Sequence, residues 1–426
     1  MSATAVSFDL VRELRGICGD EYVRERPGGG VYVSPASTEE VTAILALANQ
    51  HRLAVGPVGG STERNAAELH VDILLHVNRL TQIDHYDHAD LTVGVGAGTT
   101  ISQLNAMVGA DNLMFAGDPS IPERCTVGEL LATAGHGPLR HGYGAVRDYC
   151  IGVHFVTGDG RRAKGGGRVV KNVAGYDLMK LLIGSYGTLA VITCASFKLF
   201  PAPRQTRTFL AEFVSAEEAV AFRDRVVRSP LSPMCLELVS PVARKIMRPE
   251  RADDAWLICV RGAGSDAVLS RYQKELSSAI TRELEGDEER RMWRALQDFP
   301  QRRDRADDDM AWDTNHRLSI TVPPHDAIRV IETLQGVAST DEVEVGMTGR
   351  IGVGHIQALV WDRKPGASDA LRVVVDALRG NLDESITMKV DGAANPWPIA
   401  PANLASMRAV KQALDPNNVL RGRDIF

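Results

Sequence analysis

Apolar and polar residues follow clear periods along the N-terminal part of the chain. Apolar side chains at helical spacing predict a short amphipathic helix over 7–18. Residues 31–33 predict a strand, and the segment from Ser37 to Ala48 starts with a capping pattern and predicts a helix. Val55 opens a second strand. The chain is therefore expected to start as β-α-β.

The segment 171–193 has the pattern around which we organise the rest of the chain. Leucines between 178 and 182 lie at helical spacing and predict a short helix, which Gly184 and Gly187 end. The apolar run 189–192 then predicts a strand covered on both faces. We therefore expect residues 171–193 to form a loop, a short helix, a glycine turn and a buried strand, in that order.

The pattern changes after residue 203. Strands and helices interleave there, which predicts an α+β region with a mostly antiparallel sheet. The strand candidates are 207–214, 256–261, 317–322 and 355–361, and the helix candidates are 214–227 and 327–334. Residues 283–309 are crowded with charges of both signs, and we expect a solvated helix and loop.

Size and charge narrow the class of protein. A chain of 426 residues exceeds the size at which one core usually stops growing, so two domains are expected. The net charge of −6 provides no long-range attraction to nucleic acid or anionic lipid. Neither 91–110 nor 181–197 offers about 20 predominantly apolar residues, so no transmembrane segment is predicted.

The six cysteines lie far apart and include no C-x-x-C, which excludes an iron–sulfur run or a zinc knuckle within this chain. We expect reduced, buried thiols. The N-terminus has acidic residues and no apolar core after a basic start, which argues against a signal peptide. We therefore expect a cytoplasmic protein, either dissolved there or peripheral to the inner membrane through partners.

Two glycine-rich stretches could bind a cofactor. Residues 56–62 follow the second strand, and successive backbone N–H groups there can converge on an anion without a basic side chain; a simple tight turn is the alternative. Residues 93–98 have the spacing G-x-G-x-G and no acidic residue about 20 positions later, so we interpret them as a strand turning into a helix. A further patch of small residues, 117–140, would let the backbone approach a planar ligand.

Several motifs resemble a known family. The segment KNVAGYDLMKLLIGSYGTLAVIT looks like the last characteristic segment of the FAD domain of vanillyl-alcohol-oxidase (PCMH-type) flavoproteins. The Gly-Pro-x-Arg segment at 137–140, the Tyr-Gly-x-x-Arg-Asp segment at 143–148 and Gly-Asp-Gly at 158–160 resemble the E subunits of bacterial glycolate oxidase. The resemblance continues weakly at 316–324 and returns at 414–423.

The resemblance implies an α+β fold: a PCMH-type FAD-binding domain of two subdomains, followed by an α+β cap domain with a mostly antiparallel sheet. We expect an N-terminal helix at 1–26, the FAD-binding domain at 27–203, the cap at 204–404, and a tail at 405–426 that returns to the FAD-binding domain.

It also implies FAD as cofactor. The expected FAD-binding residues are Pro57, Val58, Gly59, Gly60, Ser61, Thr62, Gly117, Pro119, Thr126, Gly128, Ala132, Gly135, Gly137, Gly142, Gly175, Tyr176, Asp177, Gly187, Val191 and Ile192. Several relatives tether the flavin through a histidine just after the double glycine, where this chain has Ser61, so non-covalent FAD is implied.

Two residues near the expected flavin have open roles. Glu129 stands where the family usually has glycine, and we expect its carboxylate to turn out to solvent; contact with polar groups of the cofactor is the alternative. His136 is expected to be a packed loop histidine, although a pKa near 6.5 would suit a base.

Family members that oxidise 2-hydroxy acids carry a histidine-rich metal cluster in the cap. The nearest match is Gly352-Val353-Gly354-His355, and one histidine without a second ligand at metal spacing argues for an ordinary strand residue. We therefore predict no metal site and assign no catalytic residue.

The resemblance implies an FAD-binding subunit of a glycolate oxidase or dehydrogenase complex. It would carry or relay electrons from oxidation of a small 2-hydroxy acid, glycolate or D-lactate, beside a second FAD-containing dehydrogenase subunit and an iron–sulfur subunit. A stand-alone FAD-dependent oxidoreductase with its own hydroxy-acid or alcohol substrate is the alternative. With no substrate ligands identified, we expect the isolated chain not to turn over glycolate.

Overall fold

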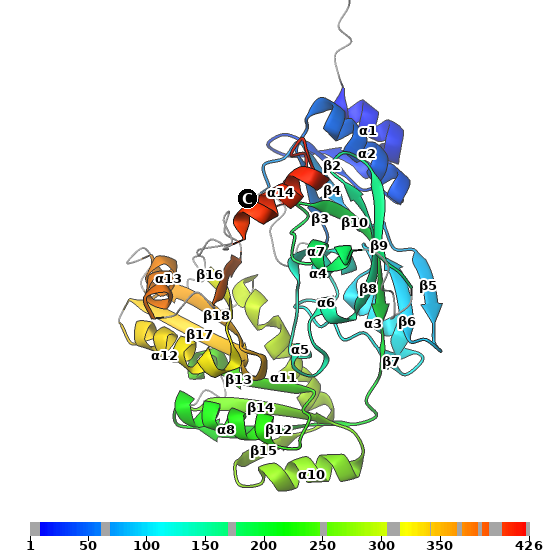
Figure 1. The fold of residues 1–426 in the computed structure, drawn as a ribbon. Helices are drawn as coiled ribbons and strands as arrows, with labels where there is room; N and C mark the ends of the chain where they lie inside the picture. Colours follow the sequence, from blue (N-terminus) through cyan, green and yellow to red (C-terminus); the bar gives the residue numbers. More distant parts are fainter. Residues whose placement is uncertain are drawn as a thin grey trace, which may run out of the picture.

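The chain folds into two lobes (Figure 1). The computed structural model describes residues 9–60, 69–168, 176–247, 254–304, 316–340, 342–363, 369–381, 386–391 and 403–422. The first lobe contains the elements up to β11 together with the last helix, α14, and the second contains β12 to β19. We refer to these as the FAD-binding lobe and the cap; the domain boundaries expected from the sequence stay predictions.

The first sheet of the FAD-binding lobe has four strands. They are β1 (Val23–Glu25), β2 (Val31–Val33), β3 (Val55–Val58) and β4 (Ile73–His76), in the order β1-β2-β4-β3. Helix α2 (Thr38–His51) connects β2 to β3, and the Ser37 side chain caps it by accepting from the N–H of Glu40. The β-α-β start is confirmed, but β4 lies between the two predicted strands and pairs parallel with both.

The second sheet has five antiparallel strands in the order β5-β6-β10-β8-β9. They are β5 (Ile83–Asp87), β6 (Thr92–Gly96), β8 (Cys150–Thr157), β9 (Arg162–Gly166) and β10 (Ala190–Lys198). Strand β10 is the predicted apolar strand; it lies at the centre of the sheet, is buried over most of its length, and extends further than the sequence pattern indicated. The predicted turn from β6 into a helix is also present, because Thr100 caps α3 (Ile101–Gly109) with a reciprocal capping box.

Short elements complete this lobe. They are α1 (Leu10–Cys18), η1 (Asp20–Tyr22), α4 (Val127–Thr133), α5 (Arg140–Tyr143), α6 (Val146–Tyr149), α7 (Leu178–Leu182) and the strand pair β7 (Leu113–Met114) and β11 (Phe200–Pro201). All six cysteines of the chain lie among the described residues; each is buried and none forms a disulfide. Within the described ranges, every helix is too short or too polar to traverse a lipid bilayer.

The cap contains one eight-stranded sheet in the order β15-β12-β14-β13-β17-β18-β16-β19, with antiparallel pairs. Its strands are β12 (Thr206–Phe213), β13 (Cys235–Val239), β14 (Trp256–Ala263), β15 (Ile280–Leu284), β16 (His316–Thr321), β17 (Val343–Arg350), β18 (His355–Asp362) and β19 (Thr387–Asp391). The helices are α8 (Ala216–Arg228), α9 (Pro241–Met247), α10 (Asp266–Leu276), α11 (Gly286–Asp298), α12 (Ala327–Ala338) and α13 (Ala370–Asn381), with 3-10 turns η4 (Phe299–Asp304), η6 (Pro324–Asp326) and η7 (Ile351–Val353). The four strands and two helices predicted for this region are present.

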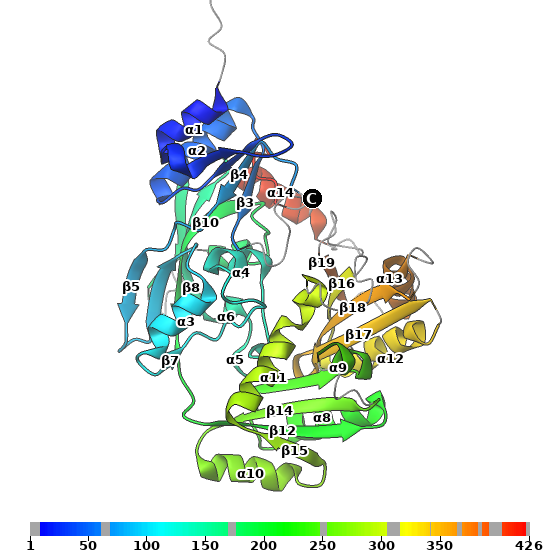
Figure 2. The same ribbon diagram turned by 180° about the vertical axis from the view of Figure 1, so that it is seen from behind.

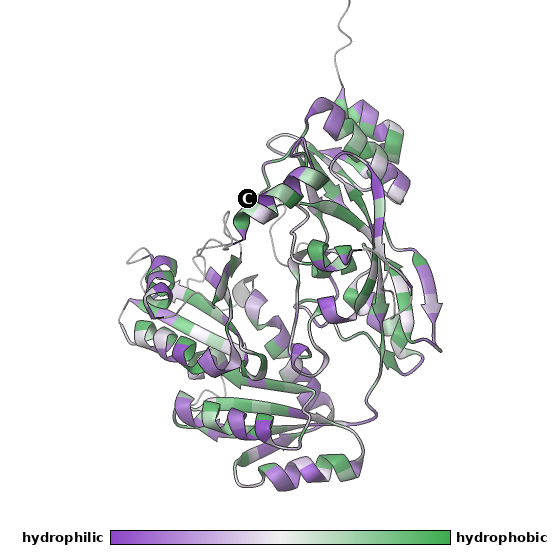
Figure 3. Cartoon of the chain, in the orientation of Figure 1, coloured by the Kyte–Doolittle hydropathy of each residue, from purple (hydrophilic) through white to green (hydrophobic). Residues whose placement is uncertain are grey.

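The half of the cap sheet formed by β16, β17, β18 and β19 has two different faces. Successive side chains of a strand point to opposite faces, so alternation along the sequence separates them. Apolar residues such as Ile320 and Ile356 face a core shared with α8, α12 and α13. The alternate positions point away from this core; they are polar at the ends of β16 and β18 that lie nearest His355, whereas Leu359 and Trp361 on β18 pack in a separate apolar cluster. In Figure 3 the helices carry both colours along their length, as expected where one side packs and the other is solvated.

Helix α11 fastens the two lobes together and lies between them in Figure 2. Arg294 donates to both carboxylate oxygens of Glu123 in the FAD-binding lobe, at 2.9 and 2.7 Å. The Asp298 carboxylate accepts from the N–H of Ile121 at 2.9 Å. The expectation of a solvated helix is therefore only partly right, because one side of α11 is buried and bonded across the lobe boundary.

The tail returns to the FAD-binding lobe through α14 (Leu404–Leu414) and is locked by a buried ion pair. Lys411 donates to the carboxylate of Asp415 and to the backbone oxygens of Thr188 and Leu420, the latter two at 2.8 and 2.9 Å. Asp415, 1% exposed, also accepts from the N–H groups of Val419 and Leu420, both at 2.8 Å. The residues that follow pair with Val55 of β3.

We predict that Lys411→Met destabilises the protein by about 3 kcal/mol, because it leaves the Asp415 carboxylate buried without its cation. The matched control is Lys274→Met on the exposed side of α10, which should change stability by less than about 0.5 kcal/mol. Urea unfolding followed by circular dichroism measures both. Equal stabilities for the two variants would contradict this role of Lys411.

Candidate functional site

The glycine loop after β3 is hydrogen-bonded to a carboxylate of the protein itself. The N–H of Gly60 donates to Oε2 of Glu129 at 2.7 Å, and the Arg124 guanidinium donates to the carbonyl oxygen of Gly60 at 3.1 Å. A Cβ at Gly60 would lie 1.8 Å from the backbone oxygen of Arg124, so only glycine fits. Ser61 and Thr62, also expected to bind the cofactor, lie outside the described residues.

The expected orientation of Glu129 was wrong. Its side chain does not turn out to solvent; the residue is 7% exposed and its carboxylate lies against the glycine loop. The physical reason is that the Gly60 amide needs an acceptor, and α4 presents Glu129 to it from its first turn.

Several expected cofactor residues converge near this loop. A Cβ at Gly59 would lie 2.4 Å from the Thr126 hydroxyl, and one at Gly187 would lie 3.2 Å from the ring of Pro57. The carbonyl of Ala132 accepts from the N–H of Tyr186 at 2.8 Å. The end of β3, helix α4 and the glycine turn before β10 are therefore in mutual contact, although they are distant in sequence.

Other expected residues lie elsewhere in the fold. Gly142 packs on the cap, where its Cβ would lie 2.8 Å from the backbone oxygen of Met234. Tyr176 is 90% exposed, and Asp177 caps α7 and pairs with Lys180 at 2.8 Å. Gly175 lies outside the described residues. The FAD-binding role of the whole expected set therefore stays a prediction.

A pocket of about 180 Å³ lies between the two lobes, where the loop after α4 meets the polar face of the cap sheet. We call it the interdomain pocket. Its lining consists of Thr133, Ala134, Gly135, His136 and Arg140 from the FAD-binding lobe, and Pro300, Ser319, Thr321, His355, Gln357, Thr387 and Lys389 from the cap.

Strand register explains why polar side chains gather on the cap wall of this pocket. His355 on β18 is the direct partner of Thr321 on β16 and of Arg350 on β17. Ser319 on β16 likewise lies opposite Lys389 on β19. Directly opposed residues share a face of the sheet, so these side chains point together toward the FAD-binding lobe.

Two histidines from different lobes meet in the pocket. The rings of His136 and His355 are perpendicular, with centroids 4.2 Å apart. The Nδ1 of His355 lies 3.0 Å from the Thr321 hydroxyl, while Nε2 has no hydrogen-bond partner within the described part of the chain. Burial, and next the neighbouring charges, lower the pKa of both rings well below the ordinary value. Both rings are therefore neutral at pH 7.

Cations dominate the electrostatics around the histidines. Arg140 and Lys389 line the pocket, and Arg350, 2% exposed, lies beside His355. Arg350 forms an ion pair with Glu237, whose carboxylate lies 3.3 Å from its Nε. Burial raises the pKa of Glu237 to about 7, so at neutral pH this carboxylate compensates the guanidinium only in part.

Asp118 supports the floor of the pocket from the FAD-binding lobe. Its carboxylate accepts from the N–H groups of Gly137 and Leu139 at 2.9 and 2.8 Å, which holds the loop that carries His136. Burial also raises its pKa to about 7. The region around the pocket therefore has more cationic than anionic charge at neutral pH and suits an anionic ligand.

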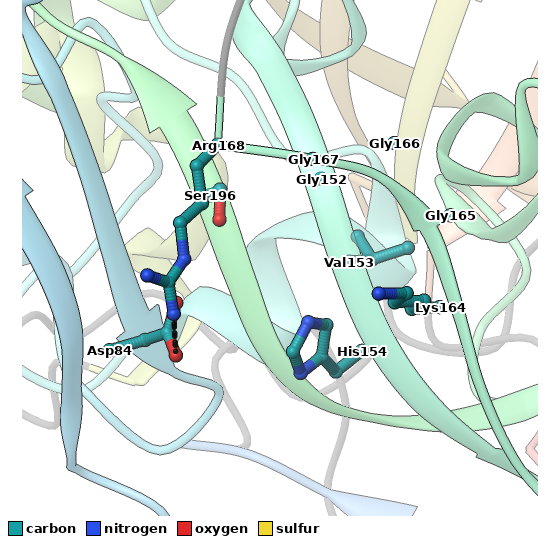
Figure 4. Close-up of a pocket in the computed structure, with 10 residues that line it drawn as sticks. All are labelled: Asp84, Gly152, Val153, His154, Lys164, Gly165, Gly166, Gly167, Arg168 and Ser196. Atoms are coloured by element: carbon teal, nitrogen blue, oxygen red, sulfur yellow. Dashed lines mark hydrogen bonds and ion pairs between the residues drawn. The ribbon is translucent and has the colours of Figure 1, made fainter. Parts of the chain in front are cut away.

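A second hollow, of about 430 Å³, lies on the FAD-binding lobe beside β8 and β9. Figure 4 shows the ion pair of Arg168 with Asp84, at 3.1 Å, on one side and Lys164 with His154 on the other. None of the expected cofactor residues lines it. We therefore place the candidate site at the interdomain pocket and not here.

The sequence motifs did not identify Arg140, Arg350 and Lys389 as residues in or beside the pocket. The signal was the alternation of polar and apolar residues in 317–321, 355–358 and 387–391, which puts the polar side chains of these stretches on one sheet face. His355 begins β18, as expected for a strand histidine. Among the described residues, no cluster of three His, Cys, Asp or Glu could hold a metal ion.

Comparison with known proteins supplies the identity of the fold. Residues 30–166 match the FAD binding domain family, and residues 202–394 match the C-terminal domain family of FAD linked oxidases. The structure is similar to 4-ethylphenol oxidase from Gulosibacter chungangensis, with a TM-score of 0.74 and 16% identity over 96% of this chain and 95% of that one.

Two curated relatives are about one-third identical to this chain over an aligned part of each sequence. The D-lactate dehydrogenase of Archaeoglobus fulgidus is 36% identical over 219 residues, which cover 51% of this chain and 48% of the relative. The glycolate oxidase subunit GlcE of Escherichia coli is 32% identical over 190 residues, covering 44% of this chain and 51% of the relative. The alignments thus span about half the length of these relatives. With both family models matched in order, the chain belongs to the FAD-linked oxidases, and its cofactor is FAD.

Proposed function

We propose that this chain oxidises a small 2-hydroxy acid in the interdomain pocket, with FAD as the electron acceptor. The observation that carries the proposal is the pocket wall, which combines the cations Arg140 and Lys389 with the unpartnered Nε2 of the buried His355. Cations bind a carboxylate, and a neutral imidazole accepts the proton of a hydroxyl group.

The residues around the glycine loop fit the cofactor. The Gly60 N–H donates to a carboxylate in this structure, as it would to a pyrophosphate oxygen, and Pro57, Gly59 and Gly187 leave the loop without bulky side chains. Residues 57–60 would hold the pyrophosphate, and the backbone at 134–137 would lie beside the flavin. When bound, FAD supplies a two-electron acceptor. We propose that it is held non-covalently and is released by acid precipitation.

The substrate would be oriented by groups from both lobes. Lys389 and Arg140 would bind the carboxylate, which leaves the 2-hydroxyl to face His355. In the tautomer that this role requires, the Nδ1–H of His355 would donate to the Thr321 oxygen, which leaves Nε2 to accept the proton. A volume of about 180 Å³ corresponds to about six water molecules, at about 30 Å³ each, which suits an acid of a few carbon atoms.

We also propose that the chain assembles into a larger complex. The similarity to a glycolate oxidase subunit supports partnership with a second FAD-containing subunit and an iron–sulfur subunit. The pocket favours the alternative of a stand-alone enzyme, because all the side chains that would hold a 2-hydroxy acid come from this one chain. The pocket is therefore a reason to expect that this chain oxidises substrate, which its sequence motifs alone did not indicate.

The first prediction concerns turnover by the isolated chain. Glycolate or D-lactate added anaerobically to the FAD-loaded protein should bleach the flavin absorbance near 450 nm, because the pocket holds the substrate beside the cofactor. The same acids should support reduction of a redox dye. If neither acid bleaches the flavin, while reduced partner subunits do reduce it, the chain is an electron relay.

The second prediction separates substrate binding from proton transfer. Lys389→Met should raise KM for the acid about tenfold, because a charge-assisted hydrogen bond is lost. His355→Gln should instead lower kcat about 100-fold through loss of the base. Lys164→Met, beside the second hollow, is the matched control and should leave both constants unchanged. A Lys389 variant with unchanged KM would exclude this carboxylate site.

The third prediction concerns pH. Below pH 7 the Glu237 carboxyl is protonated and Arg350 is uncompensated, whereas above pH 7 the carboxylate forms and offsets the guanidinium. Anions should therefore bind more weakly as pH rises from 6 to 8. Calorimetric titration of the FAD-loaded protein with oxalate measures this, and Glu237→Gln should reduce the slope. A slope unchanged in the variant would assign the pH dependence to other groups.

A further inference from the structure

We infer that Glu129 competes with the pyrophosphate of FAD for the Gly60 amide, so that the cofactor must displace this side chain in order to bind. The inference rests on the part of the proposed function that places the pyrophosphate at residues 57–60. It goes further by assigning a role to a residue of this chain: Glu129 lowers the affinity for FAD.

The competing carboxylate is built into the fold. The Thr126 hydroxyl accepts from the N–H of Glu129 at 3.2 Å and so fixes the first turn of α4. From this position Oε2 reaches the N–H of Gly60 at 2.7 Å, and a Cβ on Gly59 would lie only 3.2 Å from the same oxygen. The carboxylate therefore lies directly on the glycine loop.

The loop is held on both sides of Gly60. Arg124 donates to its carbonyl oxygen while Glu129 accepts from its N–H, so both backbone groups of this residue are satisfied by side chains. This arrangement is complete without any cofactor. It gives the protein a closed loop that is stable by itself, and it occupies an N–H group on which phosphate recognition depends.

Because both groups are anionic, the Glu129 carboxylate and the FAD pyrophosphate cannot occupy the Gly60 N–H at the same time. One N–H cannot serve a carboxylate and a phosphate oxygen at full strength, and two anions a few ångströms apart in a mostly buried site repel strongly. FAD binding therefore requires the Glu129 side chain to leave Gly60 and turn to another rotamer. The free energy of the Glu129–Gly60 hydrogen bond, together with the repulsion, is subtracted from the free energy of FAD binding.

The test measures FAD affinity directly and does not depend on turnover. Apoprotein is titrated with FAD, and quenching of flavin fluorescence gives Kd for the wild type, Glu129→Gln and Glu129→Gly. The matched control is Glu13→Gln, an exposed glutamate on α1 that removes the same charge far from the loop. We expect both Glu129 variants to bind FAD about 10- to 100-fold more tightly and the control to bind as the wild type does.

Thermal unfolding gives a second readout, because Glu129→Gly should change the melting temperature in opposite directions without and with FAD. Without FAD, Glu129→Gly should melt at a lower temperature than the wild type, because the Gly60 amide loses its acceptor. With FAD, its melting temperature should rise by more than that of the wild type, because tighter binding stabilises the folded state further.

Unchanged or weaker FAD binding by both Glu129 variants would overturn the inference, and so would a failure of every variant to bind FAD. A wild type that binds little FAD beside a Glu129→Gly variant that binds it well would support the inference most directly. The proposed oxidation is judged separately, by whether 2-hydroxy acids reduce the protein once FAD is bound.

Discussion

A guanidinium group buried between two lobes is the constraint on which the candidate site depends. Arg350 is 2% exposed, and a cation so placed is tolerated only with compensating anions nearby. Glu237 provides one from the cap, and the positive charge of Arg350 also lowers the pKa of Asp118 in the other lobe, against the larger effect of burial. Since Asp118 also holds the loop that carries His136, the electrostatics and the shape of the pocket are linked through the same few residues.

The rest of the lobe boundary keeps this arrangement in position. Helix α11 forms hydrogen bonds with the segment 119–123, directly after Asp118 in the chain. Four of the five residues that follow Asp118 are therefore bonded to the cap, through backbone or side-chain groups. A pocket assembled from two lobes needs such bonding, because a shift of about 1 Å between reacting groups is enough to impair catalysis.

The sequence predicted the elements much better than it predicted the site. Apolar periodicity located β10 and four strands of the cap, because burial of one face imposes a period that is visible locally. The contacts that define the site join residues far apart, such as Gly60 with Glu129 and His136 with His355, and no local pattern encodes such pairings. Glu129 was misjudged for this reason: its exposure is decided by an amide 69 positions earlier in the chain. The alternation of polar and apolar residues in β16, β18 and β19 is visible in the sequence. It does not locate the pocket, because the sequence does not show which face of the sheet contacts the other lobe.

The pairing of the tail with β3 has a consequence for biosynthesis. Val55 is bonded on its outer side to Val419 and Arg421, so this edge of the first sheet lacks that neighbour until residues 419–421 have been synthesised. At about 5–20 residues per second, the roughly 200 residues of the cap delay this step by tens of seconds. During that interval the strand that leads into the glycine loop has an unpaired edge, which can pair with strands of other chains.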